Sequence, residues 1–141
     1  MMVAGVLPNG HSACVSDLTY AVVRAAEDGT TYFDDDVIEL VPAVFAPGIP
    51  LVDMADPYPA TAFTISRCEA NYVSDWHPAP RRQFVLVLDG GFEITSGQGE
   101  TRIFRAGAMF LVEDIVGNGH QTKTVGNEPC TFATVANEPS D

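Results

Sequence analysis

Basic side chains are scarce in this sequence of 141 residues. It contains a single lysine, Lys123, and seven lysines and arginines in all, against nineteen aspartates and glutamates, so its formal net charge is −12. A field of this sign repels polyanions, and no basic stripe along the chain offsets it. The composition therefore argues against nucleic acid and anionic membrane surfaces as partners, and solubility is the simplest explanation of the acidity.

Long hydrophobic runs are absent as well. No run approaches the roughly 20 apolar residues that span a bilayer, and the longest ones, such as Phe84–Leu88, have the length of a strand. Met1–Gly10 has no basic start, no long apolar stretch and no clear cleavage site. We expect a cytoplasmic protein of one domain, because apolar residues make up 46% of the chain and are enough to build one core.

Cysteine pairs at metal-binding or redox spacing do not occur. Cys14, Cys68 and Cys130 are far apart in the sequence, which excludes a zinc knuckle and a thioredoxin-like motif. Three widely spaced cysteines fit buried free thiols in a reducing compartment. A nucleophilic role for Cys68 would need a partner base that the sequence does not identify.

Helical periodicity is missing from the second half of the chain. From Ala62 on, glycine turns separate short apolar segments, which we expect to be strands at Ala62–Glu69, Gln83–Leu88, Phe92–Thr95, Thr101–Phe104, Met109–Val112, His120–Val125 and Cys130–Val135. Asp89-Gly90-Gly91 predicts a hairpin in which Phe92–Thr95 pairs back on the preceding strand. The pattern is typical of an all-β antiparallel sandwich or barrel.

Residues 1–61 are less regular. Asp17–Ala26 fits either a strand or a short helix, and Asp28-Gly29 followed by Asp34–Asp36 indicates a turn and a loop. Val41–Pro59 carries five prolines, which exclude a long helix and a central strand. We expect residues 1–61 to form an N-terminal arm with edge strands, part of the same fold, and residues 62–141 to form the barrel core.

The segment Gln83–Leu88 is apolar on both of its faces. Side chains of a strand alternate between faces, so Val85 and Val87 lie on one side and Phe84, Leu86 and Leu88 on the other. One face must line the barrel interior, and the other must pack on the arm or on a second copy. A homodimer is the economical explanation.

Two stretches carry a family resemblance. Asp75–Gly91 (DWHPAPRRQFVLVLDGG) and Arg105–His120 (RAGAMFLVEDIVGNGH) resemble the two signature motifs of small single-domain bacterial cupins, and are most similar to those with a WH-x-APRRQ and a VED…GxGH segment. The resemblance extends over roughly Ala62–Val135. It implies a cupin-type antiparallel β-barrel (a double-stranded β-helix, or jelly roll) with a ligand pocket inside.

The resemblance can be carried over residue by residue. The first cupin motif supplies two histidines two apart, a glutamate and a hairpin glycine, and the second supplies a proline-glycine turn and a final histidine. The positions that match are His77 for the first histidine, Gln83 for the glutamate, Gly90 for the hairpin glycine, Gly107 for the turn glycine and His120 for the final histidine. Ala79 stands in place of the second histidine and Ala106 in place of the proline.

A metal ion is one implication of this match. His77, Gln83 and His120 would hold one divalent ion (Fe, Mn, Ni or Zn), and Glu69, Glu113 or Asp114 could complete the site. The three matched ligands are all neutral, so they would not neutralise the ion. A metal-free pocket, in which the same residues hydrogen-bond a ligand, is at least as well supported.

Further candidates flank the motifs. With Gln83 facing inward, alternation predicts that Arg81 also faces inward, where it could bind a substrate carboxylate or enolate; the alternative is an ion pair with Asp75, Glu113 or Asp114. Arg67 and Glu69 share a strand face and could enter the barrel together. Trp76 and Tyr72 are expected at a hydrophobic rim, Glu113 is a further substrate-binding candidate, and His11 is assigned to solvent.

Three functions compete. The first is an enzyme that performs acid–base chemistry on a small organic substrate (a lyase, isomerase or cyclase), in which His77 or His120 moves a proton, Gln83 and Arg81 stabilise an oxyanion and Glu69 assists. The second is an iron- or manganese-dependent oxygenase, which needs three ligands and open positions. The third is a small-molecule-binding module without turnover.

Overall fold

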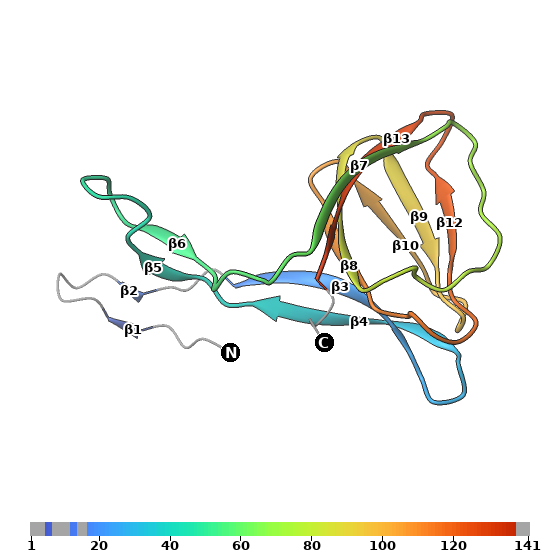
Figure 1. Cartoon of the computed structure of the whole chain (residues 1–141), viewed down its shortest axis with the longest axis horizontal. Coiled ribbons are helices and arrows are strands. Elements are labelled where there is room, and N and C mark those ends of the chain that lie inside the picture. Colours follow the sequence, from blue (N-terminus) through green and yellow to red (C-terminus); the bar gives the residue numbers. More distant parts are fainter. Residues whose placement is uncertain (1–4, 7–11, 14–16, 138–141) are drawn as a thin grey trace. The chain divides into compact units, whose positions relative to one another are not determined.

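The structure, a computed structural model, describes residues 5–6, 12–13 and 17–137. In this part of the chain every regular element is a strand, and the all-β expectation is confirmed. The strands are β1 (Gly5–Val6), β2 (Ser12–Ala13), β3 (Leu18–Ala25), β4 (Thr31–Ile38), β5 (Val41–Ala43), β6 (Val52–Met54), β7 (Ala62–Cys68), β8 (Gln83–Asp89), β9 (Gly91–Thr95), β10 (Thr101–Arg105), β11 (Met109–Val112), β12 (Gln121–Thr124) and β13 (Cys130–Ala136) (Figure 1). Among the described residues no helix is long and apolar enough to cross a membrane.

The chain divides into two units. The arm unit takes Met1–Tyr20 and Asp35–Pro57, and the barrel unit takes Ala21–Asp34 and Tyr58–Asp141. Within the arm unit β1 pairs with β2 and β5 pairs with β6, both antiparallel. Val41–Pro59 thus contains only short strands, as its prolines predict. The barrel unit includes Ala21–Asp34, which the sequence had placed in the arm.

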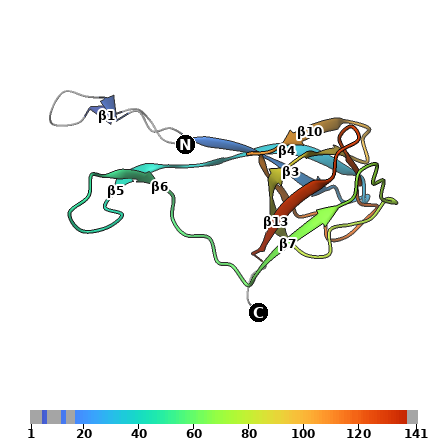
Figure 2. The same ribbon diagram turned by 90° about the horizontal axis from the view of Figure 1, so that it is seen from above.

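Two sheets form the barrel. One has the strand order β4-β3-β11-β8-β13-β7, and the other has the order β10-β9-β12. The edge strand β7 runs beside β13 in the views of both Figure 1 and Figure 2, as their antiparallel register requires. The main core cluster takes Val23, Val85 and Phe110 from the six-stranded sheet and Ile94 and Phe104 from the three-stranded sheet. The two sheets are therefore held face to face by apolar burial.

The predicted hairpin at Asp89-Gly90-Gly91 is wrong. Strand β8 pairs with β11 on one side and with β13 on the other, so it has no free edge to receive β9. Strand β9 pairs instead with β10 and β12. Gly90 is the point at which the chain changes sheets: its φ is +74°, and a Cβ there would lie 2.1 Å from the carbonyl oxygen of Pro129. Only glycine fits this approach.

A second correction concerns Asp34–Asp36. These acidic residues belong to β4 rather than to a loop. Strand β4 is at the edge of its sheet, where Asp34 and Asp35 are exposed to solvent. Three successive aspartates disfavour a central strand, but an edge strand tolerates charged side chains and is protected by them from pairing with other chains.

Strand β8 is covered unequally on its two faces. Val85 and Val87 are buried in the core between the sheets. On the other face the ring of Tyr58 lies over Phe84, at 5.3 Å between ring centroids, whereas Leu88 remains 51% exposed. The described residues therefore bury only part of this second face of β8, which was expected to pack on the arm or on a second copy of the chain.

Candidate functional site

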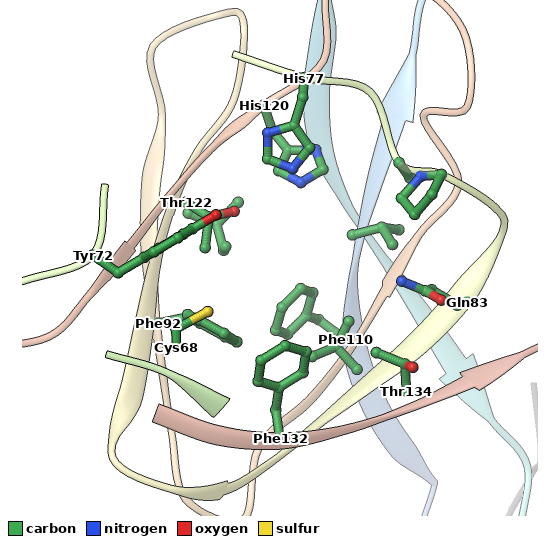
Figure 3. A pocket seen from close by; sticks show the side chains of 15 residues that line it. Cys68, Tyr72, His77, Gln83, Phe92, Phe110, His120, Thr122, Phe132 and Thr134 are labelled. Atoms are coloured by element: carbon green, nitrogen blue, oxygen red, sulfur yellow. The ribbon is translucent and has the colours of Figure 1, made fainter. Parts of the chain in front are cut away.

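A pocket of about 220 Å³ lies inside the barrel unit. Its lining comes from strands of both sheets and from the segment before β8. Figure 3 shows His77 and His120 together at one end of the pocket and Phe92, Phe110 and Phe132 at the other. The pocket is therefore largely apolar, with two imidazoles concentrated at one end.

The two histidines are held together by the backbone. The N–H of each donates to the carbonyl oxygen of the other, at 3.1 Å from His77 and 3.0 Å from His120. Their rings are neighbours, with centroids 4.9 Å apart and planes inclined at 53°. The structure thus brings together the two residues that the sequence singled out, side by side rather than on opposite walls.

Gly119 makes this approach possible. Its φ is +80°, and a Cβ at this position would lie 2.0 Å from the carbonyl carbon of His77. The hydroxyl of Thr31, which is completely buried, donates to the carbonyl oxygen of Gly119 at 2.7 Å and accepts from the N–H of Gly97 at 2.6 Å. The backbone just before His120 is therefore fixed by the absence of a side chain and by a buried hydrogen bond.

Asp114 is the residue whose role the sequence analysis missed. It was considered as a carboxylate that might complete a metal site or form an ion pair with Arg81. Its side chain is fully buried, and Oδ2 lies 2.6 Å from Nδ1 of His120. The carboxylate accepts a hydrogen bond from Nδ1–H, so the neutral imidazole has its lone pair on Nε2. The other oxygen, Oδ1, is buried without a partner among the described residues, so the imidazole is the group that compensates this carboxylate.

His77 has a weaker support. Its Nδ1 lies 2.8 Å from the backbone carbonyl oxygen of Asp75, which can only accept, so Nδ1 carries the proton here too. Both imidazoles therefore have Nε2 as their remaining acceptor. The difference is that a buried carboxylate supports His120, whereas a neutral carbonyl supports His77.

The donor set does not fit a metal ion of the expected kind. The described residues contain no group of three or more histidines, cysteines, aspartates and glutamates that could hold one. Gln83 lines the pocket, but in Figure 3 it lies well away from the two imidazoles. Asp114 uses its oxygen on Nδ1 of His120, the position of an outer-sphere partner rather than of a ligand.

Four of the charged candidates lie outside the pocket. Arg81 is exposed, because the strand begins only at Gln83 and the alternation on which its inward position depended does not extend to residue 81. Arg67 and Glu69 are also exposed, since Cys68 between them faces the pocket. Arg67 donates to the hydroxyl of Thr131 at 2.8 Å. Glu113 accepts from the Nε atoms of Arg24 and Arg82, at 2.7 and 3.1 Å. Arg67 and Glu113 therefore have structural contacts outside the pocket.

The two rim candidates differ. Tyr72 lines the pocket and is 41% exposed, which fits a position at its mouth. Trp76 is 49% exposed and is not part of the lining. His11 and Cys14 lie outside the described residues.

Cys68 and Cys130 are direct cross-strand neighbours on β7 and β13. Burial raises the pKa of the Cys68 thiol. Burial, and to a lesser degree the charges of Cys68 and Asp89, raise the pKa of Cys130 to about 11. Both thiols therefore remain protonated near neutral pH, and Cys68 contributes an uncharged, apolar surface to the pocket.

The arrangement of two sheets around a ligand pocket can be compared with known structures. Two sheets packed face to face around a pocket are consistent with the jelly-roll barrel that the sequence motifs imply. Solved structures with a partial likeness to this chain include the cupin domain of Cnp3 from Schizosaccharomyces pombe, at 14% identity over 86% of this chain and 84% of that one, with a TM-score of 0.44. SPY1581, a conserved protein of unknown function from Streptococcus pyogenes, matches at 20% identity over 56% of this chain and 65% of that one, with a TM-score of 0.42.

A third similar structure is the protein NMB1881 from Neisseria meningitidis, at 14% identity over 54% of this chain and 72% of that one, with a TM-score of 0.40. No protein-family model matches the chain, and no curated protein matches it. These partial likenesses carry no information about function. The function of this β-barrel has to be argued from its own residues.

Proposed function

We propose that the barrel pocket is the active site of an enzyme that moves a proton on a small organic substrate, as a lyase, isomerase or cyclase does. The buried pair of Asp114 and His120 supports this proposal most directly. A carboxylate that holds Nδ1–H of an imidazole fixes the tautomer and stabilises the imidazolium that forms when Nε2 takes a proton.

In the proposed step, Nε2 of His120 accepts a proton from a carbon next to a substrate carbonyl. The electron pair of the broken C–H bond moves into the carbonyl group, and an enolate oxygen forms. His120 becomes an imidazolium whose charge is balanced by Asp114, and the proton is later returned to carbon or to a leaving group. A general base in this position contributes about 10²–10⁴ to a rate.

Two neighbours have supporting roles. Thr122 is two residues beyond His120, and because side chains of a strand alternate, both line the same pocket. Its hydroxyl is placed to donate to the enolate oxygen. His77, whose ring neighbours that of His120, has its proton on Nδ1, so its Nε2 would accept a hydrogen bond from a hydroxyl group of the substrate, while the imidazolium of His120 returns the proton.

Arg81 and Glu69 have no part in this mechanism, because both are exposed outside the pocket. Gln83 remains as a hydrogen-bonding group for the ligand. An oxygenase would need a third ligand beside the imidazoles, and no observation favours it over proton transfer. A binding protein without turnover is the remaining alternative, and the experiment below separates it from an enzyme.

Exchange of carbon-bound protons tests the proposal without knowledge of the natural substrate. Ketones that differ in ring size, such as cyclohexanone and 1-indanone, are incubated in D₂O, and loss of the proton signal next to the carbonyl is followed by NMR. We expect the protein to accelerate exchange for at least one ketone, because abstraction and return of that proton is the step assigned to His120. Saturable binding without any exchange would instead identify a binding protein.

Variants test whether the proton exchange depends on His120 and Asp114. His120→Ala and His120→Gln should each lower the exchange rate by about 10² or more, because glutamine keeps hydrogen bonding but cannot transfer a proton. Asp114→Asn should lower kcat with little change in KM, since it removes the charge that stabilises the imidazolium. Asp75→Asn is the matched control: its side chain is exposed, and it keeps the backbone carbonyl that holds His77. An Asp114→Asn protein with the rate of the control would refute the role of the pair.

A further inference from the structure

Among the residues that the structure describes, no aspartate, glutamate, lysine or arginine lines the pocket. Its lining contains aromatic and aliphatic groups, the protonated thiol of Cys68, two imidazoles, and hydroxyl and amide groups. The arginines that the sequence offered as anion-binding groups are elsewhere: Arg67 bonds to Thr131, and Arg82 bonds to Glu113. A ligand carboxylate or phosphate inside would lose its hydration, and the lining offers it no arginine or lysine in return.

The apolar end of the pocket is built from aromatic rings. Phe92 and Phe132 meet edge to face, at 4.9 Å between centroids and 65° between planes. Phe110 lies beside them in Figure 3 and is 2% exposed. Because these rings come from β9, β13 and β11, both sheets fix their positions. Rigid aromatic faces and edges of this kind favour a flat, apolar ring as a ligand.

Beside the two imidazoles, the lining contains uncharged polar side chains that the described residues leave without a hydrogen-bond partner. The side chains of Gln83, Thr134 and Thr122 make no hydrogen bond to any described residue. In Figure 3, Gln83 and Thr134 lie on one side of the pocket, and Thr122 lies with Tyr72 on another. An amide offers both donors and an acceptor, so Gln83 and Thr134 can bind a hydroxyl or carbonyl group of a ligand but cannot neutralise a charge.

The volume limits the size of the ligand. An engineered apolar cavity of about 150 Å³ accepts benzene. The pocket of about 220 Å³ is larger by roughly half, which is room for a second small ring or a few substituents. Short open-chain molecules would leave the aromatic end unfilled, and larger polycyclic molecules would project from the mouth of the pocket.

We infer that the pocket binds an uncharged, mostly apolar molecule of one or two rings, with an oxygen-bearing group near the histidines and a second polar group near Gln83 and Thr134. As a statement about the substrate this rests on the proposed function; as a statement about binding it stands without it. Substrates of this class are cyclic ketones, lactones and phenols rather than sugar phosphates, amino acids or keto acids.

Three probes of matched shape test the inference by calorimetric titration at pH 7. They are 1-indanone, which is uncharged, indane-1-carboxylate, which is an anion, and 1-aminoindane, which is a cation. We expect 1-indanone to bind with a dissociation constant at least about tenfold below those of both charged probes, because each charged probe has to lose its hydration. Binding of the carboxylate as tight as that of the ketone would overturn the inference, and so would an absence of ketone binding.

A reversal of selectivity strengthens the test. Gln83→Arg places a cation in the lining, and it should tighten binding of indane-1-carboxylate at least about tenfold relative to 1-indanone. Gln98→Arg makes the same change of charge at an exposed turn residue outside the lining and should leave the selectivity unchanged. An equal effect of both variants would mean that overall charge, and not the pocket, selects the ligand.

The two proposals can fail separately. If 1-indanone binds equally well to the wild type and to His120→Ala but its protons do not exchange, the ligand class stands and the acid–base function falls. If exchange is catalysed on a charged open-chain keto acid such as pyruvate and not on cyclic ketones, the function stands and the ligand class falls.

Discussion

Gly119→Ala should damage the protein far more than its size suggests. The added methyl group would lie 2.0 Å from the carbonyl carbon and 2.1 Å from the carbonyl oxygen of His77, whereas non-bonded carbon atoms rest at about 3.5–4.0 Å. The neighbour is backbone, so it cannot rotate away. The two segments would have to separate by more than an ångström and would break the paired hydrogen bonds between His77 and His120.

The expected loss of unfolding free energy in Gly119→Ala has three contributions. A φ of +80° costs alanine about 1–2 kcal/mol. The two broken backbone hydrogen bonds contribute about 1 kcal/mol each. With the loss of packing around the displaced segment, the free energy of unfolding should fall by at least about 4 kcal/mol, against a total of about 5–15 kcal/mol for a typical domain.

Gly99→Ala is the matched control. Gly99 has a φ of +93°, but a Cβ there would have nothing within 4 Å. It therefore carries the cost of the backbone conformation without the collision, and should lose only about 1–2 kcal/mol. Urea unfolding followed by circular dichroism measures both variants. Equal losses in the two proteins would refute the argument, whereas a Gly119→Ala chain that does not fold beside a folded Gly99→Ala chain would support it.

Three further predictions can be checked with purified protein. Cys130 should resist iodoacetamide in the native state at pH 8, because a pKa of about 11 leaves on the order of one thiol in a thousand ionised, and the mass of its tryptic peptide would reveal any rapid labelling. Light scattering should give the mass of two chains, because Phe63 and Ile65 are exposed on the same sheet face as Leu88; Ile65→Glu should then give monomers, and a monomeric wild type would contradict the homodimer. Treatment with EDTA should leave proton exchange unchanged, and Mn, Fe, Ni or Zn should not raise the melting temperature; a rise that is lost in His77→Ala would establish a metal site.

The sequence was most informative where local pattern determines the structure. The strands after Ala62 follow from short apolar segments between glycine turns, and the bounds of β7 to β13 were predicted to within a residue or two. The pairing of the strands was harder to predict from the sequence than their bounds. A turn at Gly90 can be recognised from its glycines, but which sheet receives the next strand depends on the occupied edges of β8, and these are set by residues distant in the sequence.

The same distinction applies to the site. His77 and His120 were found by their motif positions, but alternation along a strand does not say which of its two faces turns inward, so Arg67 and Glu69 were placed on the wrong face. A local pattern did point to Asp114, because the buried strand β11 ends at Val112 and is followed at once by two acidic residues, Glu113 and Asp114. Which of two adjacent carboxylates turns inward was not encoded in any local pattern.

The residues proposed to transfer the proton and the residues proposed to select the ligand come from different parts of the chain. The proposed base, its carboxylate and the neighbouring hydroxyl all lie within one short stretch, Asp114–Thr122, whereas the aromatic rings and Gln83 belong to other strands. A new ligand preference can therefore arise by substitutions that leave the proton-handling stretch intact. A graft of this single stretch into another barrel would transfer base, carboxylate and hydroxyl together, but it would leave behind the backbone of His77 and the hydroxyl of Thr31, which hold His120 in place here.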